Sequence, residues 1–268
     1  MKARRQIHSA ATLAARHRIA TAATAILAVT GALSLAVAAG PANAAPPSPT
    51  AAVSLAGWKL TLPVNSSGCQ CGNNATEVNP AAITPPWLVR NSNGSVTFWA
   101  PTKGATTPHS LHPRTELVDL SDFTAGSGTH SLKGTFSIQK LPSANDIIIG
   151  QIHGGGSSSA IPLLMLHYRS GTLDVVTRKS PTVGGSTDNT LLTGVPMNTA
   201  FSYTITQNGS KFVVSVVYGA KTGTATIPVP SSFKGMDVRF QAGDYQQTNA
   251  NNSPTDGGRL TVTALTAN

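Results

Sequence analysis

From Leu55 to the C-terminus, apolar and polar residues alternate in short runs that glycine, asparagine, serine and proline interrupt. Alternation with a period of two, rich in β-branched residues, predicts half-buried β-strands. The clearest runs are GSVTFWAP, GTHSLKGTFSIQKL, NDIIIGQIH, IPLLMLHYRSGTLDVVTRK, AFSYTITQNGSKFVVSVVYG, KTGTATIPVP, MDVRFQAGDYQQ and GRLTVTALTA. Asn208-Gly209 predicts a type I′ hairpin turn. Because helical periodicity is nearly absent, we expect an all-β fold, a jelly-roll antiparallel β-sandwich with a concave groove.

One run, IIIGQIHGGG at 147–156, changes from apolar to polar within a strand. Side chains at positions i and i+2 of a strand share a face, so Gln151 and His153 are expected side by side. By the same alternation, Ile148 and Ile152 are expected on the opposite face, in the core. The run therefore predicts a strand that has one apolar face and one face with an amide and an imidazole.

Two further runs carry polar side chains on a single face. In HPRTELVDL, Arg114 and Glu116 share a face. In VRFQAGDYQQ, the face opposite the apolar residues carries Arg239, Gln241, Tyr245 and Gln247. Each polar pair alone could be structural, and Arg114 with Glu116 could be a surface ion pair. If the three strands are neighbours, however, these side chains converge on one surface.

The first 44 residues have the layout of a secretory signal peptide. Five basic residues precede an uncharged apolar run at 19–39, and the small-residue pattern Ala42-Asn43-Ala44 follows it. A permanent membrane anchor is the alternative, because the run is close to spanning length; Arg4-Arg5 also resembles a twin-arginine export signal. We expect a signal peptide at 1–44, a Pro-rich linker at 45–54 and one domain at 55–268, secreted and without a permanent membrane anchor.

The signal peptide changes the charge of the protein. The chain has 19 Lys and Arg, 10 Asp and Glu and a net charge of +9, and loss of the five cations in residues 1–44 lowers this to +4. The remaining cations form no basic run, so nucleic acid is not an expected partner. A mildly positive field suits an anionic polymer, and we expect a monomer that binds one.

Two cysteines, Cys69 and Cys71, stand in SGCQCGNN. In an exported protein they can form a disulfide across a surface loop. A metal site would require further ligands nearby, and the surrounding sequence has none. We therefore expect no metal site, and the state of the cysteines remains open between paired and free.

The blocks RTEL, QIH and FQAGDYQQ, in this order and at these separations, resemble the signature blocks of the alginate lyases of polysaccharide lyase family seven. The segments GWKLTLPV and GATTPHSLHPRTEL are also similar, and the resemblance extends over Ala56 to Asn268. It implies a jelly-roll enzyme, without a cofactor, that cleaves a 1,4-linked polyuronate by β-elimination and leaves 4,5-unsaturated uronate ends.

The resemblance also implies four catalytic residues: Arg114, Gln151, His153 and Tyr245. The C5 hydrogen of a uronate is hardly acidic while the adjacent carboxylate is charged. Arg114 and Gln151 can neutralise that group by hydrogen bonding. Neutral His153, with an ordinary pKa of about 6.5, can remove the C5 proton, and Tyr245 can protonate the departing oxygen. Tyr245 could take both roles on mannuronate, and Ile152 is typical of members that accept guluronate.

The chain departs from the family at positions that bear on the substrate. Arg239 stands where the family has Tyr, Gln241 where it has Lys, and Val118-Asp119 where it has Arg-Glu. Arg239, His167 and Arg169 could replace the lost cations. The residues expected to bind substrate are Glu116, Arg239, Gln241, Gln247, His167 and Arg169. Alginate is the expected substrate, and glucuronan or another polyuronate is the alternative.

Two other classes of protein fit the fold. A glycoside hydrolase needs two carboxyl groups beside the bond, but the ten acidic residues include no Glu-x-Asp or Glu-x-Glu pair, and Glu116 and Asp119 differ in parity. A non-catalytic carbohydrate-binding jelly roll usually presents exposed aromatic residues, and the chain has only three tryptophans. Such a module has no use for His153 and Tyr245 together, so a lyase is the favoured interpretation.

Overall fold

The computed structural model describes residues 51–268 except 159, 160 and 183. The expected signal peptide, the Arg4-Arg5 pair and most of the expected linker lie outside the described residues. Val53 is buried in the core and its backbone N–H donates to the carbonyl of Gly94 at 3.0 Å. The packed domain therefore includes part of the segment expected as a linker. No helix among the described residues is both long and apolar enough to cross a membrane.

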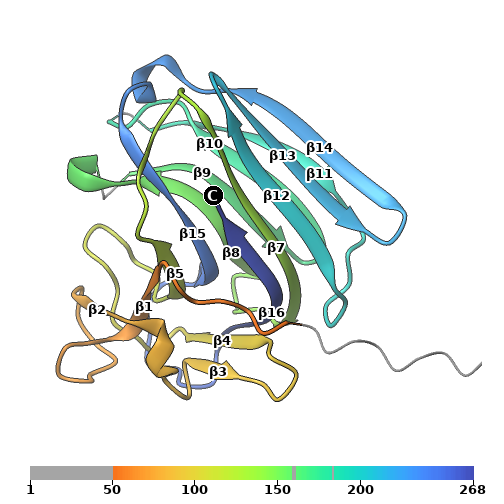
Figure 1. Cartoon of the computed structure of the whole chain (residues 1–268). Helices are drawn as coiled ribbons and strands as arrows, with labels where there is room; N and C mark the ends of the chain where they lie inside the picture. Colours follow the sequence, from red (N-terminus) through yellow and green to blue (C-terminus); the bar gives the residue numbers. More distant parts are fainter. Residues whose placement is uncertain (1–50, 159–160, 183) are drawn as a thin grey trace, which may run out of the picture. The chain divides into compact units, whose positions relative to one another are not determined.

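The strands form two antiparallel sheets (Figure 1), which confirms the expected all-β sandwich. In the described residues the larger sheet has the order β11 (Ser186–Leu192), β10 (Thr172–Arg178), β9 (Pro162–Arg169), β8 (Asp146–Gly154), β15 (Asp237–Gln246), β5 (Thr115–Asp119), β1 (Trp58–Asn65) and β2 (Ala75–Val78), and β6 (Phe123–Thr124) pairs with β15. The smaller sheet has the order β14 (Lys221–Pro228), β13 (Lys211–Tyr218), β12 (Phe201–Asn208), β7 (Thr129–Lys140), β16 (Gly257–Ala267), β4 (Val96–Pro101) and β3 (Leu88–Arg90). Within the part of the chain that the structure describes, three short 3-10 helices lie between strands: η1 (Pro80–Ala82), η2 (Gly156–Ser158) and η3 (Ser231–Phe233).

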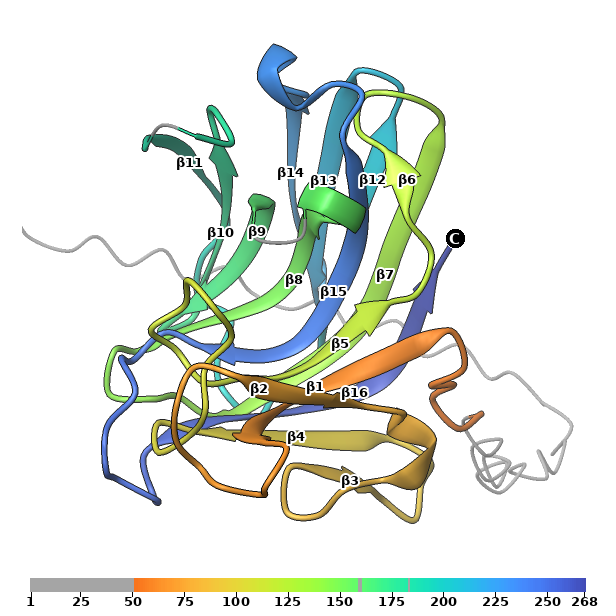
Figure 2. The same cartoon turned by 90° about the vertical axis from the view of Figure 1, so that its left-hand side faces the viewer.

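The core lies between the two sheets. Buried and partly exposed positions alternate along β12 and β13, as expected for strands with one face in the core. Tyr168 of the larger sheet stacks on Phe201 of the smaller sheet at a centroid distance of 5.9 Å. Apolar packing of this kind fixes the inner face of each sheet. The outer face of the larger sheet is therefore left for polar side chains, and Figure 2 shows this sheet curving from β11 through β8 and β15 to β2.

The expected hairpin between β12 and β13 is present, but its turn differs. Asn208 pairs with Lys211, so the two loop residues are Gly209 and Ser210, and of these only Gly209 has a positive φ, +54°. The type I′ turn expected at Asn208-Gly209 is therefore wrong, because it needs two positive φ angles.

A bulge in β8 corrects one expected side-chain direction. The pairing of β8 with β9 shifts between Ile148 and Gly150, which inserts an extra residue into β8. Ile149 and Ile152 consequently belong to the core, whereas Ile148 lines the pocket on the outer face. The expectation that Ile148 lies on the inner face, opposite Gln151 and His153, is therefore wrong, although its side chain is buried. The expectation for Ile152 is confirmed.

Candidate active site

A pocket on the outer face of the larger sheet brings the expected catalytic residues together. Its lining includes all four of them, Arg114, Gln151, His153 and Tyr245, and also Gln241 and Gln247. Strand register explains this convergence. On neighbouring strands, Gln241 pairs with Gln151 and Arg239 pairs with His153. Directly paired residues of antiparallel strands present neighbouring side chains on the same face.

Glu116 organises the floor of the pocket. It is 0% exposed. Its Oε2 accepts a hydrogen bond from Nη1 of Arg114 at 3.0 Å, and its Oε1 accepts one from Nε2 of Gln151 at 2.6 Å. Burial raises the pKa of Glu116, and the charge of Arg114 and the two hydrogen bonds oppose this rise. Glu116 was expected to bind substrate, but the structure places it beneath the pocket, where it orients two other side chains.

Gln151 is fully buried and uses its amide group as a donor twice. Besides the bond to Glu116, its Nε2 donates to Oε1 of Gln241 at 3.2 Å. Its own Oε1 has no hydrogen-bond partner in the described residues. The bond to Gln241 is the longer of the two, so it is the one that Gln151 can exchange more readily for a bond to a ligand.

His153 lies in an environment that keeps its imidazole neutral. Burial lowers its pKa to about 4, with a further lowering from the positive charges of Arg114 and Arg239. Nδ1 lies 3.4 Å from the carbonyl oxygen of Gly154. A proton on Nδ1 directed to this oxygen leaves Nε2 as the basic nitrogen. The arrangement suits a residue that accepts a proton.

Tyr245 is held by contacts on its ring and on its hydroxyl group. The guanidinium carbon of Arg114 lies 3.4 Å from the centroid of the Tyr245 ring, a cation–π contact. The Tyr245 hydroxyl oxygen lies 3.0 Å from Oγ of Ser110. Ser110 and His112 also line the pocket, and the pKa of His112 is lowered by burial. Sequence reasoning missed both residues because they lie in the loop before β5, where strand alternation assigns no face.

The other expected substrate-binding residues occupy different positions. Gln247 lines the pocket, and its amide donates to the backbone carbonyl of Tyr245 at 3.0 Å. Arg239 is paired with Asp122 at 3.1 Å, next to His153 but outside the pocket lining. His167 is buried and its Nδ1 lies 2.8 Å from Oδ1 of Asp146.

Arg169 is likewise absent from the pocket lining. Its guanidinium contacts three carboxylates, those of Asp146, Asp174 and Asp188, at 3.0, 3.4 and 3.0 Å. Arg169 and His167 are thus occupied by acidic partners in this structure, and neither side chain projects into the pocket beside Gln241.

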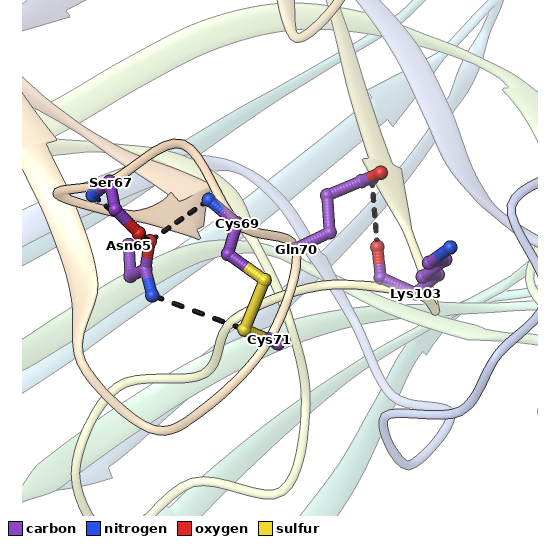
Figure 3. Close-up of a disulfide and its surroundings, with 6 residues drawn as sticks. All are labelled: Asn65, Ser67, Cys69, Gln70, Cys71 and Lys103. Atoms are coloured by element: carbon purple, nitrogen blue, oxygen red, sulfur yellow. Dashed lines mark hydrogen bonds between the residues drawn. A yellow bond between two sulfur atoms is a disulfide. The ribbon is translucent and has the colours of Figure 1, made fainter.

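Cys69 and Cys71 form a disulfide in the loop that follows β1 (Figure 3). Oδ1 of Asn65 accepts hydrogen bonds from the backbone N–H groups of Ser67 at 3.0 Å and Cys69 at 2.9 Å, which closes the loop onto the end of the strand. Gln70 donates to the carbonyl of Lys103 at 3.0 Å. Over 51–268, apart from the three positions not described, no group of three or more His, Cys, Asp or Glu side chains is arranged to hold a metal ion.

Comparisons with known proteins agree with this fold. The family model described as alginate lyase matches residues 53–268. The solved structure of alginate lyase A1-II', a member of polysaccharide lyase family 7, is 27% identical, covers 80% of this chain and 95% of that chain, and has a TM-score of 0.67. Alginate lyase PA1167 from Pseudomonas aeruginosa is also 27% identical, with 80% and 99% covered and a TM-score of 0.68.

Two further comparisons complete these findings. A variant of A1-II', 26% identical to this chain, has been solved in complex with a substrate, GGMG; it covers 80% of this chain and 93% of that chain, with a TM-score of 0.67. Curated proteins yielded no match. Because the family model matches nearly the whole described domain, the chain belongs to the alginate lyase family and is a polysaccharide lyase.

Proposed function

We propose that this protein is a secreted alginate lyase that cleaves the 1,4-linkage by β-elimination at the pocket around His153 and Tyr245. The observation that carries the proposal is that Arg114, Gln151, His153 and Tyr245, which come from three separate parts of the sequence, line one pocket. A substrate complex of A1-II' supports a polysaccharide as the ligand of this fold.

Arg114 and Gln151 bind the carboxylate of the uronate whose C5 proton is removed. Arg114 offers forked donors and a fixed positive charge, which lowers the energy of the enolate-like charge that develops on the carboxylate. Gln151 donates to the same group when it releases its 3.2 Å bond to Gln241. Glu116 holds both side chains in place from below, so it acts as a positioning residue.

His153 is the base and Tyr245 is the acid. Neutral Nε2 of His153 takes the C5 proton, the electron pair of the C5–H bond forms the C4–C5 double bond, and the bond from C4 to the glycosidic oxygen breaks. The Tyr245 hydroxyl gives its proton to that oxygen. The low pKa of His153, about 4, keeps the imidazole unprotonated at neutral pH. On mannuronate, Tyr245 alone could perform both transfers.

Alginate is the proposed substrate, and glucuronan is the alternative. Gln241 takes the place of a cation that the family resemblance leads one to expect, and it is engaged with Gln151 rather than paired with an acid. The pocket therefore holds fewer positive charges than expected.

The test is to incubate the protein separately with alginate, glucuronan and pectate and to measure the formation of unsaturated uronate ends by ultraviolet absorbance. We expect absorbance to rise with alginate. The rate of this rise should be at least about 100-fold lower for His153→Ala and for Tyr245→Phe. No rise on any of the three polymers would contradict a lyase. Sequencing the N-terminus of protein recovered from the culture medium tests export, with a mature start near Ala45 expected.

A further inference from the structure

The pocket continues past His153 onto the neighbouring strands of the larger sheet. Its lining includes Pro162 and Met165 of β9 and Arg178 at the end of β10. Pro162 pairs with His153, and Met165 pairs with Gln151. Because adjacent strands are about 4.8 Å apart, Arg178 lies two strands, roughly 10 Å, from His153. A polymer that crosses the strands from the cleaved bond reaches Arg178 only with a more distant sugar unit.

Arg178 carries a positive charge that the rest of the described chain leaves unpaired. The pocket lining has one other Lys or Arg, Arg114, which is bonded to Glu116. Arg178 forms no ion pair with a described residue, and its buried Nε has no hydrogen-bond partner there. A partly buried guanidinium without a partner is costly, so an anion that enters the pocket is favoured beside it.

The outer face of β9 and β10 carries negative charge at the end of these strands away from Arg178. Asp174 and Arg178 share a face of β10 and are four residues apart, roughly 13 Å at the usual rise per residue. The carboxylates of Asp146, Asp174 and Asp188 all contact the guanidinium of Arg169. Three acids against one arginine and one histidine, His167, leave this cluster negative, and it therefore repels a polyanion. The sheet therefore offers a polyuronate one attractive path and one repulsive path away from the catalytic residues.

We propose that Arg178 binds the carboxylate of a uronate unit remote from the cleaved bond and directs the polysaccharide over Pro162 and Met165, away from the aspartates around Arg169. The apolar side chains of Pro162 and Met165 pack against the C–H groups of the sugar rings, while the forked guanidinium matches a carboxylate. This inference rests on the proposed lyase function. It assigns the recognition of chain length to Arg178, a residue that takes no part in the chemistry.

The test compares Arg178→Ala with Lys179→Ala on long-chain alginate and on alginate oligosaccharides of graded length. Lys179 is the adjacent residue, is exposed and is absent from the pocket lining, so its loss changes the net charge equally. We expect Arg178→Ala to raise KM for the long chain about tenfold, the scale of one charge-assisted contact, with kcat unchanged. For the shortest oligosaccharide that is cleaved, the two variants should behave alike. Arg178→Lys should recover part of the loss.

An unchanged KM for Arg178→Ala on long alginate would overturn the proposed subsite, and so would an equal rise in KM for every oligosaccharide length. Either result leaves the lyase function intact, because the unsubstituted protein is still active. Absence of turnover by the unsubstituted protein on all polyuronates contradicts the lyase function and the subsite together.

Discussion

Oε1 of Glu116 accepts a 2.6 Å hydrogen bond from Nε2 of Gln151 beneath the pocket, while Oε2 of the same carboxylate accepts from Arg114 at 3.0 Å. A single buried acid therefore sets the direction of both groups proposed to bind the substrate carboxylate. Rigid support of this kind holds a site in its productive geometry before the ligand arrives.

Glu116→Gln tests this support. The neutral amide leaves the charge of Arg114, which is 7% exposed, without its acidic partner. We expect a loss of about 3 kcal/mol in the free energy of unfolding, as for a broken buried pair. Misplacement of Arg114 and Gln151 should also lower kcat by about 100-fold. Denaturant unfolding and initial rates on alginate measure the two effects.

Glu77→Gln is the matched control for stability. Glu77 pairs with Lys59 at 2.6 Å, but both side chains are considerably exposed, 44% and 30%. The same substitution there should cost less than about 1 kcal/mol. Equal losses of stability in the two variants would show that burial of Glu116 does not matter, contrary to the structure.

The pH dependence of activity should reflect the low pKa of His153. Burial and the charges of Arg114 and Arg239 favour the neutral imidazole, so its pKa is about 4. Activity depends on the neutral form, and it should therefore persist as pH falls through 6.5 and decline only nearer to about 4. The measurement is the acidic limb of kcat/KM against pH, with circular dichroism at each pH to show that the protein stays folded.

Arg239→Ala should move the acidic limb of the kcat/KM profile toward higher pH. Arg239 is the more weakly acting of the two cations that lower the pKa of His153, and its removal favours the protonated imidazole. Lys234→Ala, an exposed cation close in sequence, serves as the control and should leave the limb in place. A limb near the ordinary histidine pKa in every variant would contradict the lowered pKa of His153 and the contribution of Arg239 to it.

The Ser110 hydroxyl should matter through Tyr245 alone. The two oxygens are 3.0 Å apart, and Ser110 is also bonded to the backbone carbonyl of His112 at 3.1 Å, which holds its hydroxyl in place. Ser110→Ala removes the one hydrogen bond that the Tyr245 hydroxyl makes with a neutral side chain, together with the bonds of Ser110 to the His112 backbone, and should lower kcat by no more than about tenfold. In Tyr245→Phe the added Ser110→Ala change should have no effect on the residual rate. Additive losses would mean that Ser110 acts independently of Tyr245.

The sequence predicted which strands contribute side chains to the candidate site, and the reason is the period of two along each strand. Arg114, Gln151, His153 and Tyr245 could be placed on one face because strand alternation is strict between bulges. Ile148 was placed wrongly because a bulge reverses that alternation, and a bulge leaves little trace in composition.

Pairing between distant residues could not be read from the sequence. Arg169 and His167 have the parity expected for the outer face, but the partner of both, Asp146, comes from the neighbouring strand. Arg178 stood in the same run, TLDVVTR, and was overlooked because its lack of a partner is visible only once the strands are assembled. The residue types on one face of a strand can be read from the sequence of that strand. Whether their charges are paired depends on the neighbouring strands of the sheet.

Asp244 is a buried acid that the proposed mechanism does not use. It is 0% exposed and directs its carboxyl toward Gly258 of β16, in the other sheet. Burial, together with the nearby charge of Glu116, raises the pKa of Asp244 well above its usual value. The folded protein therefore keeps this carboxyl protonated at pH values at which the unfolded chain, with a pKa of about 3.8, has lost the proton.

Asp244→Asn should make the protein more stable at neutral pH. The unfolded chain of the unsubstituted protein binds fewer protons than the folded state above pH 3.8, so its stability falls as pH rises, and an asparagine removes this contribution. The gain in the free energy of unfolding should be clear at pH 7 and should shrink toward zero near pH 4, measured by denaturant unfolding at both values. Asp237→Asn, at the exposed start of the same strand, should change stability little at either pH. A gain of equal size at pH 4 and pH 7 would mean that packing, rather than ionisation of Asp244, is responsible.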